Sequence, residues 1–133
     1  MTTTQPALFI PAPDYDRLMA MAEGAARSQP DVADFLLQEL ERASLTPPAR
    51  DARIVTMGSH VRFRDETTGC NREAQLVYPE RADAAAQRIS ILTPVGAALI
   101  GLSEGQTMQW RTRDGKVKSL TVLKVRHETE KDA

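Results

Sequence analysis

The sequence has few of the residues that most often mark chemistry. Cysteine occurs once among 133 residues, at Cys70, so no internal disulfide forms, which fits a reducing compartment. No window approaches the roughly 20 apolar residues of a membrane span. The start, "MTTTQPALFIPAPD", lacks the basic residues and the long apolar run of a signal peptide. We therefore expect a cytoplasmic protein of bacterial type with no membrane partner.

Neither sign of charge dominates. Seventeen basic residues face 18 acidic ones, for a net charge of −1, which gives no bulk attraction to nucleic acid or membranes. Hydrophobic residues make up 41% and charged residues 26%, which suits one compact domain or a domain with a small appendage.

Sequence motifs for catalysis are also absent. The two histidines, His60 and His127, lie far apart and have no cysteine or histidine at ligand spacing. Gly96 and Gly101 are not followed by the Lys-Ser/Thr of a phosphate loop. We expect no catalytic residue, no metal, no cofactor and no small-molecule substrate.

Residues 1–45 show a helical period. Apolar residues recur at helical spacing from Tyr15 to Ala26 and again from Val32 to Ala43, and the break "RSQPD" separates the two runs. Pro13 and Pro30 suit the first turn of each helix. Because the connection is short, the pattern predicts an antiparallel helical hairpin.

The period changes to two after a Pro-rich linker, residues 46–53. Region 54–127 reads as five or six strands, beginning with "RIVTM" (53–57), plus one short helix from Pro94 to a Gly101 cap. "RDGK" (113–116) reads as an Asp-Gly hairpin turn. We expect an antiparallel sheet and an α+β fold, ending in a polar tail, residues 128–133.

Two groups of charged residues are candidates for contact with a partner. His60, Arg62 and Arg64 alternate outward on one predicted strand, where they suit phosphates or an acidic protein surface, or are an ordinary solvated face. Asp31 and Asp34 lie near the hairpin turn. They could present carboxylates to a metal or partner, but acids in a first helical turn also stabilise the helix.

Three stretches together resemble a known family: "VTMGSHVRFRDETTG", "REAQLVYPERAD" and "ISILTPVGAALIGLSEGQTMQWRTRDGKVKSLTVLKV". They look like the C-terminal domain of the Gre transcript-cleavage factors of the GreA/GreB family. Within it the strongest similarity is to the branch named Rnk, for regulation of nucleoside diphosphate kinase. The match covers Val55 to Val125, and "ADFLLQELERA" extends it into the hairpin.

The resemblance implies an FKBP-like C-terminal domain without isomerase activity, and binding to RNA polymerase near the rim of its secondary channel. Residues matching the Gre docking loop are Thr93, Pro94 and Val95. The family also implies an effect on nucleoside diphosphate kinase levels. Nucleic acid would then be met only through the polymerase complex, with a monomeric chain favoured.

Gre factors use acids at the tip of a long hairpin to stimulate transcript cleavage by the polymerase. Here the helices are short, and Asp31 and Asp34 fall within the second helix, which favours a binder without cleavage activity. Two alternatives stay open. One is an active cleavage factor that uses these two acids, and the other is an FKBP-like peptide-binding module or isomerase, for which aromatics at 5% are few.

Overall fold

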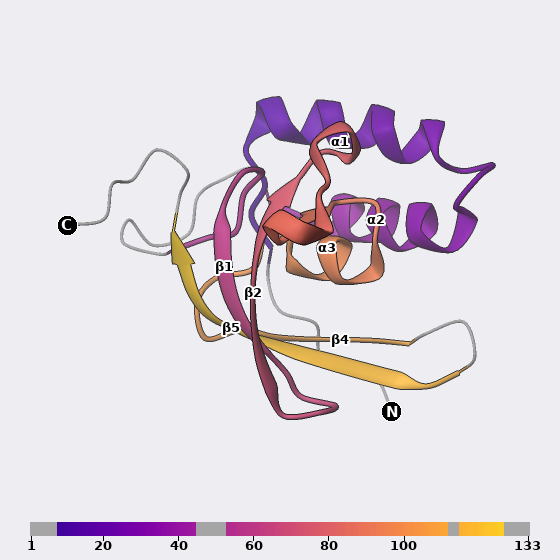
Figure 1. Cartoon of the computed structure of the whole chain (residues 1–133). Coiled ribbons are helices and arrows are strands. Elements are labelled where there is room, and N and C mark those ends of the chain that lie inside the picture. The colour runs from indigo at the N-terminus through magenta and orange to yellow at the C-terminus, as the bar shows by residue number, and fades with distance from the viewer. Residues whose placement is uncertain (1–7, 45–52, 112–114, 127–133) are drawn as a thin grey trace.

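The fold is a helical hairpin packed on a curled sheet (Figure 1). The computed structural model describes residues 8–44, 53–111 and 115–126. Helices α1 (Ala12–Gly24) and α2 (Pro30–Arg42) come first, and α3 (Pro94–Leu99) lies between strands of the sheet in sequence. Figure 1 shows all three helices on the same side of the sheet. The predicted α+β fold is confirmed.

The hairpin forms where the helical period predicted it. Each helix has a proline in its first turn, where the missing N–H has no helical partner to lose, and α1 has Asp14 at its positive end. Leu18 of α1 and Leu36 and Leu40 of α2 are fully buried. The two helices therefore pack through one apolar stripe each and present their polar faces outward.

The sheet has five strands in the order β3-β2-β1-β5-β4. Their bounds are β1 (His60–Asp65), β2 (Cys70–Val77), β3 (Arg88–Ser90), β4 (Thr107–Arg111) and β5 (Val117–Arg126). Three of the four pairings are antiparallel, but β2 and β3 are parallel, so the expectation of a wholly antiparallel sheet is wrong. Parallel pairing needs a crossover, which two 3-10 turns, η1 (Pro79–Arg81) and η2 (Ala84–Ala86), provide.

The strand predicted at 53–57 is also wrong. Among the described residues, Ile54 forms only an isolated bridge with Ser103. The backbone of Val55 bonds instead to the segment after α3, at Gly101 and Leu102. This stretch therefore pairs with the segment after α3 and does not join the five-stranded sheet. The "RDGK" turn lies partly outside the described residues, although β4 and β5 do pair antiparallel as expected.

A β-bulge interrupts the pairing of β1 with β5. Phe63 faces Val122, but the next residue back along β1, Arg62, faces Lys124, so Leu123 is an extra residue. An extra residue reverses the alternation of a strand. Val122 and Val125 are therefore both buried although they are three residues apart.

One core joins hairpin and sheet. Leu18, Leu36 and Leu40 belong to the same buried cluster as Phe63 of β1 and Leu99 of α3. At the surface, the Arg17 guanidinium of α1 lies 3.6 Å from the centroid of the Tyr78 ring, and its Nη2 lies 3.1 Å from Glu80 Oε1. The hairpin is thus held on the sheet by apolar packing and by the contacts of Arg17 with Tyr78 and Glu80.

Helix α3 sits tightly on the end of β3. A Cβ on Gly96 would clash with the Ser90 carbonyl oxygen, so only glycine permits this approach. The predicted Gly101 cap is wrong by one residue: α3 ends at Leu99 and Ile100 is its C-cap, while Gly101, at φ +81°, makes the turn that follows. None of the described helices is long and apolar enough to cross a membrane.

Candidate functional site

A groove of about 620 Å³ runs between α2 and strand β4, and the start of α3 borders it. We call it the α2–β4 groove. It brings together residues that sequence analysis treated as separate candidates, Asp31 and Asp34 of the hairpin and Pro94 of the docking corner. Its lining residues are Asp31, Val32, Asp34, Phe35, Gln38, Glu39, Arg42, Pro94, Gln109, Trp110 and Arg111.

Two aromatic rings form the apolar part of the groove. Phe35 of α2 and Trp110 of β4 are stacked, with ring centroids 6.2 Å apart and planes inclined by 24°. Both are half-buried. Trp110 thus packs the hairpin against the sheet.

An ion pair between a buried carboxylate and a more exposed arginine lies beside these rings. Only 4% of Glu39 is exposed, and its Oε2 accepts hydrogen bonds from Arg42 Nε at 3.0 Å and Nη2 at 2.7 Å. The Arg42 Nη2 also approaches Met108 Sδ at 3.9 Å. Burial raises the pKa of the Glu39 carboxyl above its ordinary value, and Arg42 opposes this rise only in part. The pair gives the groove a fixed charged wall.

The three residues of the predicted docking corner have different surroundings. The Thr93 hydroxyl caps α3: it donates to the Ser90 carbonyl oxygen at 2.8 Å and accepts from the Gly96 N–H at 3.1 Å. Val95 is half-buried and packs on the core. Pro94 alone of the three is exposed and lines the groove. Docking here would therefore use Pro94 directly and Thr93 as its support.

The acids of the hairpin lie on α2 itself, beyond the turn at residues 25–29. Asp31 and Asp34 are exposed, and a spacing of three residues puts them on the same side of the helix, along the groove. Among the described residues, no group of three His, Cys, Asp or Glu side chains is placed to hold a metal ion. The two acids give one wall of the groove a negative charge, opposite Arg111.

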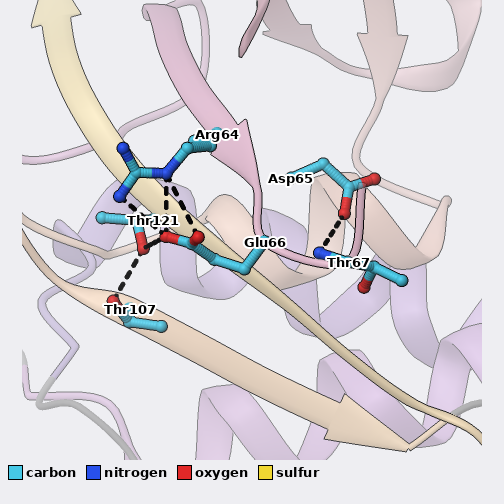
Figure 2. A network of polar contacts seen from close by, with 6 residues as sticks. All are labelled: Arg64, Asp65, Glu66, Thr67, Thr107 and Thr121. Carbon is cyan, nitrogen blue, oxygen red and sulfur yellow. Dashed lines mark hydrogen bonds and ion pairs between the residues drawn. The ribbon is translucent and has the colours of Figure 1, made fainter. Parts of the chain in front are cut away.

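The predicted basic row on β1 divides in two. Arg64 is tied to Glu66, whose carboxylate it meets through Nε and Nη2 at 3.0–3.1 Å (Figure 2). Glu66 also accepts a hydrogen bond from the Thr121 hydroxyl, which contacts that of Thr107. These bonds lower the pKa of Glu66 and raise that of Arg64. Arg64 thus belongs to a surface network that joins β1, β5 and β4.

His60 and Arg62 lie in a separate hollow of about 410 Å³ on the outer face of the sheet. Lys124 and Arg126 of β5 lie opposite them, with Arg62 facing Lys124 and His60 facing Arg126. Neither β5 residue was predicted from the sequence, because simple alternation from Leu120 and Val122 would turn Lys124 and Arg126 toward the core. Only the bulge at Leu123 places them outward.

Comparison with known proteins agrees with this architecture. Residues 50–127 match the family model "Transcription elongation factor, GreA/GreB, C-term", and residues 6–45 match the model "Rnk N-terminus". The chain belongs to the GreA/GreB family. The predicted resemblance, including its Rnk branch, is confirmed.

Relatives from both branches of the GreA/GreB family align with the chain. The "Regulator of nucleoside diphosphate kinase" of Escherichia coli strain K12 is 34% identical over 96% of this chain and 94% of its own length. The "Transcription elongation factor GreA" of Syntrophobacter fumaroxidans is 33% identical, but the match covers 69% of this chain and 59% of that protein. The first relative therefore aligns nearly end to end, and the second only in part.

A solved structure shares the fold. The "Prokaryotic transcription elongation factor GreA/GreB from Nitrosomonas europaea" superposes with a TM-score of 0.66 at 35% identity, over 89% of this chain and 98% of that one. The GreA/GreB family members named here are transcription elongation factors and a regulator.

Proposed function

We propose that this chain is a transcription regulator that binds RNA polymerase near its secondary channel and has no enzymatic activity of its own. The α2–β4 groove carries the proposal, because Pro94, the Phe35–Trp110 stack and the acids of α2 line one continuous surface. Apolar rings flanked by charges of both signs are typical of a protein-binding surface. Family membership supports polymerase as the partner.

The hairpin is the reason to propose binding without transcript cleavage. Helix α2 has 13 residues, which gives a length of about 20 Å. Asp31 and Asp34 lie along the α2–β4 groove and not in the connecting turn, so they belong to the surface proposed to bind the polymerase. The hairpin then alters access to the channel or competes with Gre factors there. An effect on nucleoside diphosphate kinase levels would follow through transcription.

Binding to core RNA polymerase tests the groove directly. Asp34→Lys reverses a charge in the groove, and Pro94→Ala shortens its exposed apolar corner. Each should weaken binding about fivefold or more, since interface residues that matter cost more than about 1 kcal/mol. Glu41→Lys is the matched control, because Glu41 is exposed on α2 but does not line the groove. Biolayer interferometry measures all three.

Two outcomes would contradict the proposal. No polymerase binding at micromolar concentration would show that polymerase is not the partner. An equal loss of binding in the Glu41→Lys control would show that the groove is not the binding surface.

A backtracked elongation complex with magnesium tests whether the chain stimulates transcript cleavage. RNA shortening above the polymerase's own rate, lost in the Asp31→Ala, Asp34→Ala double variant, would make the chain an active cleavage factor.

A further inference from the structure

The outer face of the sheet carries a cationic hollow whose chemistry differs from that of the α2–β4 groove. His60 and Arg62 of β1 and Lys124 and Arg126 of β5 line it, with Ala86 and Gln87 forming a wall on the β2 side. Among the described residues of the lining, Glu73 is the one carboxylate, and it pairs with Arg62 at 3.2 Å. The described lining therefore holds three permanent cations, Arg62, Lys124 and Arg126, and one carboxylate.

The bulge at Leu123 assembles this hollow. Without the extra residue, the alternation that buries Leu120 and Val122 would turn Lys124 inward and Val125 outward. With it, Val125 stays in the core and both Lys124 and Arg126 join Arg62 and His60. Bulges often re-aim side chains next to functional sites.

Two further features suit an extended anion. The cationic pairs Arg62–Lys124 and His60–Arg126 form two rows, separated by about 6.7 Å along the strands. The wall residue Gln87 is held at φ +59°, the one positive φ outside glycine among the described residues. A non-glycine residue in that region of backbone space costs free energy, and such residues often occur at functional sites.

Two classes of anion could bind here, an acidic protein surface or the phosphates of a nucleic acid. The described lining favours phosphates because it has no apolar anchor. Protein partners are held mainly by buried aromatic and apolar residues. The hollow has alanines and the largely buried Val61 but no aromatic ring. Arginine and lysine side chains are sufficient to bind the phosphates of a nucleic acid, and such contacts do not depend on the base sequence.

We propose that this hollow binds the phosphate backbone of a nucleic acid, independently of sequence. The proposal goes beyond the sequence-based expectation that nucleic acid is met only through the polymerase. The hollow and the α2–β4 groove lie on opposite faces of the sheet, so one chain can hold both partners at once.

Fluorescence anisotropy of the free chain with a labelled single-stranded RNA and a labelled duplex DNA, both of mixed sequence, tests the proposal. We expect dissociation constants of about 10–100 µM near 20 mM salt, and a slope of log K against log salt of about −2 to −3 for the duplex. Lys124→Glu should weaken binding about fivefold or more. Lys118→Glu is the charge-matched control. Lys118 is exposed on the same strand and lies opposite Trp110 in the register of β4 and β5, away from the hollow.

Three results would overturn the proposal: no binding of either nucleic acid at low salt, equal losses in the two variants, or binding of poly-L-glutamate in their place with the same dependence on Lys124. The last result would assign the hollow to an acidic protein. Because polymerase is absent from the assay, its failure leaves the proposed function standing.

Discussion

Glu39 is the residue whose protonation is most closely tied to the packing of α2. Its carboxyl is buried and its pKa is raised above the ordinary 4.5, so the folded state holds the proton more tightly than the unfolded state. The stability that this provides is full below pH 4.5 and is lost as pH rises through the folded pKa. Relative to a Glu39→Gln variant, the wild type should therefore lose stability between acid and neutral pH.

Urea unfolding at a series of pH values measures this difference. Glu41→Gln serves as the control, because Glu41 is exposed on the same helix and should show no such trend. A difference between wild type and Glu39→Gln that grows in favour of the wild type as pH rises would mean that Arg42 dominates over burial at this site.

At the scale of the element, the close packing of α3 on the end of β3 depends on the absence of a side chain at Gly96. In Gly96→Ala the new Cβ would meet the backbone of Ser90, which cannot move without shifting β3. We expect a loss of about 1–3 kcal/mol in the free energy of unfolding. Gly24→Ala is the opposite case, because a Cβ there meets nothing within 4 Å and the helix gains about 0.5–1 kcal/mol. Chemical denaturation of both variants checks the opposite signs.

Elements with a strong local period were predictable. Both hairpin helices, the alternating strand β1 and the Pro-started α3 follow from residues within one or two turns of each other, although α3 is capped at Ile100 and not at Gly101. The parallel pairing of β3 and the bulge at Leu123 were not, because both depend on which distant strand lies alongside. The same holds for the site: Pro94 and Asp34 were named singly, but only packing of α2 on β4 places them in one groove.

At the scale of the whole molecule, hairpin and sheet share a core and should unfold together. Leu36 of α2 is fully buried in the cluster that includes Phe63 and Leu99. Leu36→Ala should cost about 2–5 kcal/mol and destabilise the sheet as much as the hairpin. Far-UV circular dichroism and Trp110 fluorescence should then give one coincident transition. Gln38→Ala, on an exposed position of α2, should change little.

Two separate transitions in the Leu36→Ala variant, with helix signal lost first, would mean that the hairpin folds as an independent unit. The Phe35–Trp110 stack makes fluorescence a suitable probe, because the emission of Trp110 reports on the contact between α2 and β4.

The first described residues lie between segments from much later in the chain. The Phe9 N–H donates to the Gly101 carbonyl oxygen, the Ile10 N–H donates to that of Ser44, and the Ser44 N–H returns a bond to Leu8. During synthesis this segment leaves the ribosome well before Gly101, so Leu8 and Ile10 cannot reach their final burial until the residues around Gly101 have followed. The nascent chain therefore carries these two apolar side chains without their final partners until then, and this early segment reaches its place late.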